Sequence, residues 1–177
     1  MQKIKNEDLG RISARDYKDS VKTSIVIVLD NIRSMNNIGS AFRTADAFRI
    51  EKIILTGITA QPPHREINKT ALGATNSVPW EYIEQPAMAI ELLKKDNYQV
   101  FAIEQVHNST MLHQFEPQQN LKYALVFGNE VKGVSNELMN IVDGCLEIPQ
   151  KGTKHSLNIS VSIGIVLWDF VHKMKIF

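Results

Sequence analysis

The sequence predicts an α/β fold with a mainly parallel sheet and helices on both of its faces. Short apolar runs such as Ser24–Leu29 and Tyr123–Phe127 have the length and composition of strands that are buried on both faces. A helical pattern at Asn37–Phe48 lies between such runs, and strands that alternate with helices favour a parallel sheet. The 177 residues contain no internal repeat and no Gly/Ser-rich or Pro-rich linker, so one domain with a sizeable core is expected.

The remaining elements follow from the same patterns. Further strands are expected at Lys52–Thr56, Val78–Ile83, Tyr98–Ile103 and Cys145–Ile148, with a helix at Met88–Lys95. The apolar pattern that begins near Leu157 is long enough to favour a final helix. The apolar residues of that segment fall at helical spacing: Ile159, Ile163, Val166 and Phe170. Residues 1–22 are polar, with Leu9, Ile12 and Tyr17 at roughly helical spacing, and predict a short helix or a frayed arm.

The composition is that of a soluble globular protein, with 44% hydrophobic and 22% charged residues. Cys145 is the single cysteine, which excludes an intrachain disulfide and favours a reducing, cytoplasmic location. The sequence contains no apolar run of membrane-spanning length and no signal peptide, so no membrane partner is expected. A net charge of +1 is low for a protein that coats nucleic acid, but it allows an enzyme with a local basic surface.

Polar residues follow three of the predicted strands. The segments are Asp30–Arg43, Gly128–Gly133 and Gln150–Asn158. Because ligands bind outside the carboxyl ends of parallel strands, the three segments together predict a site at one edge of the sheet.

Each segment also has a structural interpretation when it is taken singly. Asn37 is a candidate helix N-cap, and Arg43 is a candidate solvated side chain or partner of Asp46. Gly128–Glu130 could be an ordinary turn, and Ser156 could cap the final helix. The coincidence of all three segments at one edge favours the functional interpretation.

The same segments carry a family resemblance. The patterns are Asn37-x-Gly39-x-x-x-Arg43, then Phe127-Gly128-Asn129-Glu130-x-x-Gly133, then Ile148-Pro149 with Ser156-Leu157-Asn158-Ile159-Ser160. In this order they resemble the three motifs of the SpoU (TrmH) family, which belongs to the SPOUT superfamily of RNA methyltransferases. The resemblance spans Ser24 to the C-terminus. It implies a single SpoU-type domain over residues 23–177 whose C-terminal part forms a deep trefoil knot, against the general rule that chains are not threaded.

The resemblance also implies an activity. It is that of an S-adenosylmethionine-dependent RNA ribose 2′-O-methyltransferase, which releases S-adenosylhomocysteine and needs no metal. Structured RNA is the implied substrate, with tRNA favoured over rRNA. The alternatives are an rRNA 2′-O-methyltransferase, an enzyme of the superfamily that methylates a base nitrogen, and a catalytically silent RNA-binding module. The family further implies a homodimer whose sites are completed across the interface. The apolar stripe of the final helix suits that interface, although a helix buried within one chain would show the same stripe.

Cofactor contacts are implied for six residues of the motifs and of the strand before them. They are Ile103, Glu104, Gly128, Asn129, Ile148 and Leu157. Gly128 makes physical sense in this role, because a missing side chain lets the backbone approach the adenosine.

The catalytic role belongs by resemblance to Arg43, contributed across the dimer interface. A ribose hydroxyl is a poor nucleophile, and a guanidinium hardly ever loses its proton, so stabilisation of the developing alkoxide is the preferred role. Orienting roles are implied for Asn37, Glu130, Ser156 and Asn158. RNA is expected to approach over basic residues in loops of the same edge: Arg33, Arg65, Lys132, Lys151 and Lys154, with His64, Lys69 and His155.

Overall fold

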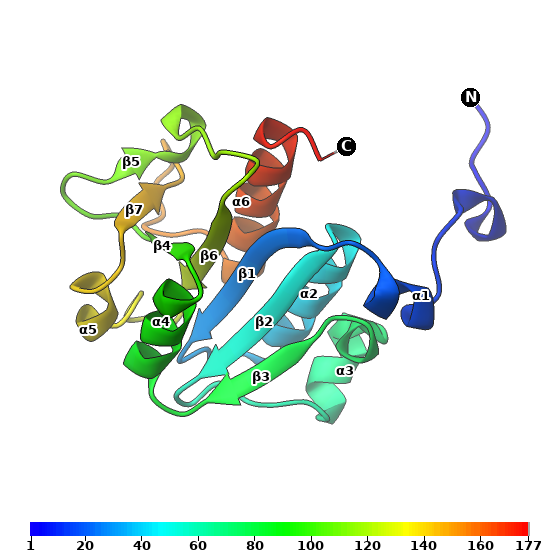
Figure 1. Ribbon diagram of the computed structural model, residues 1–177, viewed down its shortest axis with the longest axis horizontal. Coiled ribbons are helices and arrows are strands. Elements are labelled where there is room, and N and C mark those ends of the chain that lie inside the picture. Colours follow the sequence, from blue (N-terminus) through cyan, green and yellow to red (C-terminus); the bar gives the residue numbers. More distant parts are fainter. Residues whose placement is uncertain (177) are drawn as a thin grey trace.

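The computed structural model describes residues 1–176, with Asn6 described by its backbone alone, and has a twisted sheet at its centre (Figure 1). The strands are β1 (Thr23–Asp30), β2 (Ile50–Thr56), β3 (Trp80–Ile83), β4 (Tyr98–Ile103), β5 (Thr110–Met111), β6 (Lys122–Phe127) and β7 (Gly144–Glu147). Within the described residues they form one seven-stranded sheet in the order β3-β2-β1-β6-β4-β7-β5, and each neighbouring pair is parallel. The predicted parallel α/β sheet is therefore confirmed.

Helices cover both faces of this sheet, as the sequence predicts (Figure 1). They are α1 (Ala14–Asp19), α2 (Met35–Ala47), α3 (Arg65–Ala71), α4 (Pro86–Lys95), α5 (Asn136–Met139) and α6 (Ile159–Lys173), with 3-10 turns η1 (Asn6–Leu9), η2 (Ala74–Asn76) and η3 (Leu112–Gln114). Alternate residues of β1 serve two cores. Ile27 and Leu29 pack with α2, α3 and α6, while Val26 and Val28 pack with α4 and α5. This alternation explains why the β1 run is apolar at every position.

Two helix caps differ from the sequence-based interpretation. The α2 cap is Ser34, whose Oγ accepts a hydrogen bond from the Asn37 backbone N–H at 3.3 Å, so the expectation that Asn37 is the N-cap is wrong. The α6 cap is Asn158, whose Oδ1 accepts from the Ser160 N–H at 2.9 Å, and not Ser156. Because Ser34 caps α2, the Asn37 side chain is free to form hydrogen bonds with residues of other loops.

The helix α3 was not predicted, because the sequence was interpreted as loop around His64 and Arg65. His64 caps this helix through its ring Nδ1, which accepts from the Glu66 N–H at 3.2 Å. The placement of Arg65 in a loop is therefore wrong, since Arg65 is the first residue of α3. The helix α3 has only seven residues, and this periodic pattern is too short to identify a helix from the sequence.

The final helix is present, but its apolar stripe faces inward. Residues Ile159, Ile163, Val166 and Phe170 are at most 8% exposed and pack within this chain, so the stripe belongs to a helix buried within the chain and not to a dimer interface. A different set is exposed on α6: Val161, Ile165 and Trp168, at spacings of four and three residues. Helical periodicity identifies the helix, but α6 is apolar on two faces, and the pattern alone does not say which face is buried.

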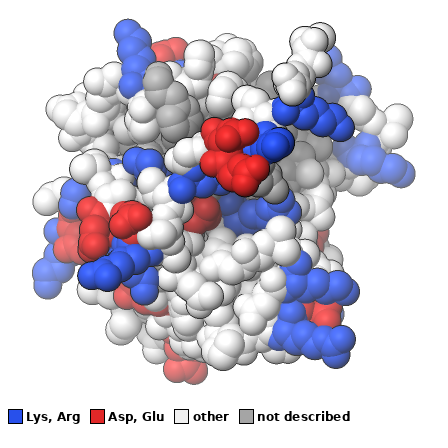
Figure 2. Space-filling model, turned by 90° about the vertical axis from the view of Figure 1, so that its right-hand side faces the viewer, with Lys and Arg blue, Asp and Glu red and all other residues white. Residues whose placement is uncertain are grey.

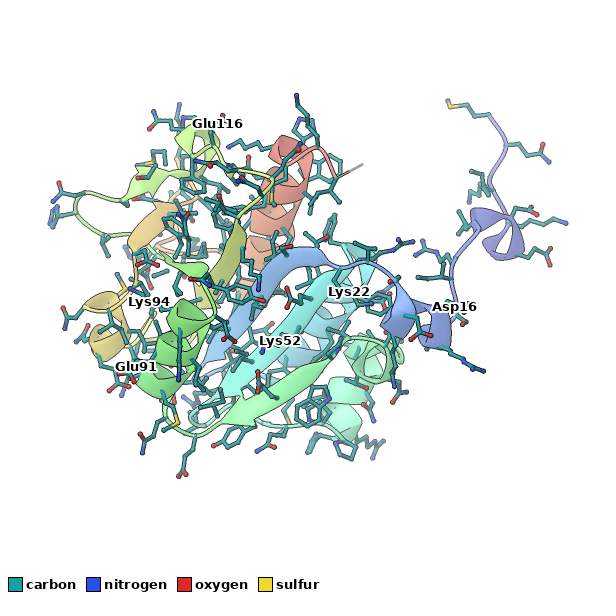
Figure 3. All side chains as sticks on the ribbon, viewed as in Figure 1. Asp16, Lys22, Lys52, Glu91, Lys94 and Glu116 are labelled. Atoms are coloured by element: carbon teal, nitrogen blue, oxygen red, sulfur yellow. The ribbon has the colours of Figure 1, made fainter. Side chains whose placement is uncertain are left out.

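The N-terminal segment extends away from the sheet and returns to it at α1 (Figure 1). Tyr17 is buried and belongs to the core, whereas Leu9 and Ile12 are exposed, so the three residues do not share one helical face. Asp16 and Lys22 lie on either side of Tyr17 in the chain (Figure 3). The domain boundary expected after residue 22 stays a prediction. Among the described residues, no helix is both long and apolar enough to cross a membrane.

Candidate active site

A cavity of about 510 Å³ opens at the carboxyl edge of the sheet. The ends of β4, β6 and β7 and the loop before α6 form its walls. All six residues expected to contact the cofactor line it: Ile103, Glu104, Gly128, Asn129, Ile148 and Leu157. Parallel strands place their carboxyl ends at one edge, which is why motifs far apart in the sequence meet here. The role of these residues as cofactor contacts stays a prediction.

The second motif forms a tight turn along one wall of the cavity. The backbones of Asn129 and Gly133 exchange two hydrogen bonds, each of 2.9 Å. The Asn129 side chain closes the turn from inside, because its Oδ1 accepts from the N–H groups of Val131 at 3.0 Å and Lys132 at 3.1 Å. Its Nδ2 donates to the Asn31 carbonyl at 2.7 Å and so ties the turn to the first loop. The described contacts of this side chain are therefore structural.

Two glycines make this turn possible. A Cβ on Gly128 would lie 2.1 Å from the carbonyl carbon of Gly133 and 2.1 Å from the Val134 nitrogen. Gly133 has a φ of +69° and packs against the Glu104 carboxylate, where a Cβ would lie 2.2 Å from Oε2. The sequence suggested that the missing side chain of Gly128 lets the backbone approach the adenosine. In the structure it lets the Gly128 backbone pack closely against the backbone of Gly133 and Val134.

Buried Asp30 links the first loop to the segment after the turn, and sequence reasoning did not assign it a role. Its Oδ2 accepts from the Ser135 N–H at 2.7 Å, and its Oδ1 accepts from Asn31 Nδ2 at 2.7 Å. Asn31 has a φ of 56°, and its Oδ1 accepts from the Ile58 N–H at 3.1 Å. The signal was present in the sequence, since an acidic residue at the end of a buried strand must be paired.

A hydrogen-bonded chain joins all three motifs. Asn158 Nδ2 donates to Asn37 Oδ1 at 3.3 Å, and Asn37 Nδ2 donates to Glu130 Oε1 at 3.1 Å. Glu130 also accepts from the backbone N–H groups of Arg33 at 3.1 Å and Ser34 at 3.0 Å. Because an ionised carboxylate only accepts, it orients the Asn37 amide, whose oxygen must then face Asn158.

The electrostatics of Glu130 follow from these contacts. Partial burial raises the pKa of this carboxyl, but hydrogen bonds from its own backbone, from the Arg33 and Ser34 N–H groups and from the Asn37 amide outweigh the burial. The net result is a pKa below the ordinary value. Glu130 is thus an ionised acceptor near neutral pH, which suits an orienting role better than proton transfer.

The opposite wall of the cavity is held by residues after β4. Glu104 accepts from the N–H of Gln105 at 2.9 Å and from the N–H of Val134 at 3.1 Å. Gln105 Nε2 donates to the His155 carbonyl at 2.7 Å, which fastens the loop before α6. Behind this wall, burial raises the pKa of the Cys145 thiol to about 11, and the group donates to the Glu104 carbonyl at 3.3 Å. Cys145 is therefore protonated at neutral pH and poorly nucleophilic.

Comparison with known proteins identifies the family. The SpoU rRNA methylase family matches residues 24–168, which include all three motifs. The chain belongs to this family. A protein named as a TrmH family tRNA/rRNA methyltransferase from Staphylococcus aureus is 28% identical over 159 residues, or 90% of this chain. The chain spans 63% of the length of that relative.

Solved structures of SpoU-type proteins share the fold. An AdoMet-bound rRNA methyltransferase from Sinorhizobium meliloti matches with a TM-score of 0.78 and 26% identity, over 88% of this chain and 59% of the other. The TrmH/SpoU tRNA modifying enzyme of A. aeolicus has a TM-score of 0.78 and 24% identity, over 92% of this chain and 79% of the other. The chain therefore has the fold of these SpoU-type proteins.

The SpoU-motif arginine lies apart from this cavity. Glu130, Ser156 and Asn158 line the cavity. Asn37 is hydrogen-bonded to Glu130 and Asn158 beside it, but Arg43 does not line it. Arg43 lies further along α2, on the wall of a separate hollow of about 800 Å³ formed with the N-terminal segment and the turns after α3. Its suggested pairing with Asp46 is not seen among the described residues, where Asp46 Oδ1 instead accepts from Ser77 Oγ at 2.5 Å.

The basic residues expected to meet RNA are exposed but do not form a single group. Arg33 and Lys132 together line a hollow of about 630 Å³ beside the cavity, on the other side of the 129–133 turn. Lys151 and Lys154 lie in the exposed loop before α6, and Arg65 begins α3. Figure 2 shows the side of the molecule where the N-terminal segment lies, and there Lys and Arg side chains form several groups with acidic side chains between them. Within the described residues, no cluster of His, Cys, Asp and Glu has the arrangement of a metal site.

Proposed function

We propose that the protein transfers a methyl group from S-adenosylmethionine to a ribose 2′-hydroxyl of structured RNA, with tRNA favoured over rRNA. One observation carries this proposal: the second and third SpoU motifs line a single cavity, and Asn37 of the first motif is joined to them there by the chain Asn158–Asn37–Glu130. Membership of the family and the fold shared with an AdoMet-bound rRNA methyltransferase support it.

The cavity fits the methyl donor. Its volume of about 510 Å³ lies in the range of small-molecule sites. Apolar side chains of Ile103, Ile148 and Leu157 offer a surface for the adenine ring, and the carboxylates of Glu104 and Glu130 give the cavity a charge that favours a sulfonium. When bound, this cofactor supplies an electrophilic methyl group. The residues proposed to hold it are the six predicted ones, and S-adenosylhomocysteine is the product.

The chemical step needs a group that stabilises the ribose oxygen as it attacks the methyl carbon. A carbon–oxygen bond forms, the carbon–sulfur bond breaks with its electron pair on sulfur, and the hydroxyl proton leaves to water or to an RNA phosphate. We assign stabilisation of the developing negative charge to Arg43. Asn37, Glu130 and Asn158 fix the loop geometry beside the donor, and Ser156 on the cavity wall contributes to positioning the ribose.

A homodimer is part of the proposal, because Arg43 does not line the cavity of its own chain. Exposed apolar residues on α6 favour a second copy as the partner. Val161, Ile165 and Trp168 are 49%, 38% and 56% exposed and form one stripe, with Gly164 beside it in open space. Burial of such a stripe against a symmetric copy would bring Arg43 of one subunit toward the cavity of the other. We propose that each site is completed in this way.

The RNA would lie across the basic residues that surround the cavity. Arg33 and Lys132 line the neighbouring hollow. Lys151 and Lys154 lie in the exposed loop before α6, between Gln150 and His155, which line the cavity. Arg65 offers a further contact at the start of α3. Such residues neutralise phosphates and position the RNA without reading its sequence.

The decisive experiment measures where the methyl group goes. Protein is incubated with labelled S-adenosylmethionine and bulk tRNA or rRNA, and the RNA is digested to nucleosides. Label on ribose-methylated nucleosides from tRNA is expected. Label on a base, or no label with either RNA, would overturn the proposed reaction, and label in rRNA alone would reassign the substrate class.

The knot implied by the family also belongs to this proposal. In the described chain, β7 lies between β4 and β5, and the chain then passes residues 148–158 and reaches α6, which packs on α2. We propose that this passage is threaded as a deep trefoil knot. Tracing residues 122–173 in a crystal structure tests the threading, and a chain that crosses without passing through the loop would exclude it.

A further inference from the structure

Three arginines surround the hollow that holds Arg43. This hollow, of about 800 Å³, lies between the segment Leu9–Ala14, the C-terminal part of α2 and the turns after α3. Arg11, Arg43 and Arg49 line it and are exposed. Asp46 is the one acidic residue of its lining, so the lining carries a net charge of +2, whereas the whole chain carries +1. This hollow is therefore a locally basic surface on a nearly neutral protein.

The three guanidinium groups are unsatisfied within the chain. Among the described residues, Arg11, Arg43 and Arg49 have no hydrogen bond or ion pair from their side chains. The nearby carboxylate of Asp46 is already bonded to Ser77. Several unpaired guanidiniums around one concave surface are suited to a polyanion, because each presents a planar fork that matches a phosphate.

The segment that carries Arg11 is held in place by Tyr17. This side chain is 3% exposed, and its hydroxyl donates to the carbonyls of Ala45 and Ile50 at 3.4 Å each. Ser13 caps α1 through Oγ, which accepts from the Asp16 N–H at 3.1 Å. Arg11 therefore comes two residues before the N-cap of a fixed helix and lines the hollow.

Arg49 occupies a backbone position that usually favours glycine. It follows the C-cap of α2 with a φ of 49°, in the left-handed region, and its N–H donates to the Asp46 carbonyl at 3.1 Å. A left-handed arginine is strained relative to glycine there. The side chain is exposed, and its charge acts on the nearby Tyr17 hydroxyl and Lys22 ammonium without a hydrogen bond to either among the described residues. This combination points to a use of the charge itself.

We propose that Arg11 and Arg49 form a phosphate-binding site for the RNA backbone, next to the alkoxide-stabilising Arg43. The inference rests on the proposed function, and it assigns two residues outside the SpoU motifs. The exposed apolar rim of Leu9, Ile12 and Leu72 suits the sugar and base faces that flank a phosphate. In the homodimer, this site and Arg43 face the methyl donor of the other subunit together. The phosphodiester bound here fixes which ribose reaches Arg43.

The test compares RNA affinity, salt dependence and folding in three variants. Arg11→Ala and Arg49→Gly each remove one proposed phosphate contact, and Lys95→Ala removes an exposed charge on α4, on the other face of the sheet. Anisotropy with a fluorescein-labelled tRNA transcript gives the dissociation constant at several salt concentrations. Each arginine variant should weaken binding about tenfold and lower the salt slope by about one, while Lys95→Ala changes neither.

Arg49→Gly separates binding from folding. Because glycine is favoured at a left-handed position, its thermal unfolding midpoint should equal or exceed that of the wild type while RNA binding weakens. Arg49→Lys should restore part of the affinity. Unchanged affinity and salt slope in both arginine variants would overturn the inference. So would a shifted monomer–dimer equilibrium with unchanged RNA affinity of the dimer, which would assign the arginines to the partner subunit.

The two proposals fail in distinguishable ways. A wild-type protein that binds tRNA through these arginines but transfers no methyl group would overturn the proposed function and leave the phosphate site standing. Methyl transfer to ribose with wild-type kinetics in Arg11→Ala and Arg49→Gly would leave the function standing and overturn the phosphate site. A wild type that binds neither tRNA nor rRNA would overturn both.

Discussion

The two parts of α2 differ in how far the chain itself satisfies their polar side chains. Near its N-terminus, Asn37 is hydrogen-bonded on one side to Glu130 and on the other to Asn158. Beyond its middle, the exposed Arg43 side chain has no hydrogen-bond partner among the described residues, and the same holds for the Arg49 side chain just after the helix. A preorganised site holds its polar groups before substrate arrives. The first part is therefore complete within one chain, whereas the second is completed by RNA and a second subunit only in the proposed function.

The largest effect is expected at Arg43. Arg43→Ala should lower the rate of methyl transfer by about 10²–10³-fold, because one donor to a developing oxyanion is lost. The affinity for S-adenosylmethionine, measured by calorimetry, should stay unchanged, since Arg43 does not line the cavity. Arg15→Ala, an exposed arginine of α1 that does not line either site, is the matched control. Full turnover by Arg43→Ala would contradict the assigned role.

Mixed dimers show whether Arg43 acts across the interface. Leu157→Arg would obstruct the cavity from a 37% exposed position that folding should tolerate. A mixture of this variant with Arg43→Ala would then contain dimers with one intact composite site. About a quarter of wild-type activity is expected after random exchange of subunits. Activity no higher than that of either variant alone would place Arg43 in the site of its own chain.

The next effect concerns the exposed stripe of α6. Trp168→Glu should weaken the dimer by at least about a hundredfold, because an unpaired charge would be buried at the interface. Sedimentation equilibrium measures the change. Leu92→Glu on α4, which replaces a 47% exposed apolar residue on the other face of the sheet, should leave the dimer intact. Equal dimerisation of both variants would place the interface elsewhere.

Within the complete part of the site, Gly128 is the most sensitive position. Gly128→Ala should destabilise the fold by about 1–3 kcal/mol, because its Cβ would lie 2.1 Å from backbone atoms of Gly133 and Val134. Gly152→Ala, where a Cβ meets nothing within 4 Å, should change the stability by less than about 0.5 kcal/mol. Chemical denaturation of both variants measures the difference, and equal stability would show that the turn relaxes freely.

The sequence predicted the features that follow from local patterns, and it did not predict those that depend on how distant segments pack. Buried strands such as β4 and β6 were located from their apolar runs, and the cavity residues were named because motifs at carboxyl strand ends must meet. What covers the α6 stripe that includes Ile163 was left open by the sequence, because Ile165 belongs to a second apolar stripe and only packing distinguishes the two. The hollow around Arg11 was missed as well, since it depends on where Tyr17 anchors an otherwise polar segment.

The smallest expected effect tests how the complete part of the site is held together. In the folded protein the pKa of Glu130 is lowered, so this carboxylate stabilises the fold above its unfolded pKa of about 4.3, and the contribution is lost as the pH falls through the folded pKa. Glu130→Gln should therefore lower the unfolding midpoint by about 2–4 °C at pH 7, since an amide cannot accept all three hydrogen bonds equally well.

The difference between wild type and Glu130→Gln should then shrink as the pH falls below about 4, because the wild-type carboxyl becomes protonated. Glu116→Gln is the control, since Glu116 is exposed and points outward in Figure 3. A constant difference from pH 7 to pH 3 would mean that the shape of the side chain, and not its charge, orders the Asn37 amide. In that case the amide, and with it Asn158, would be oriented by packing alone, and the contrast between the two parts of α2 would no longer rest on an ionised acceptor.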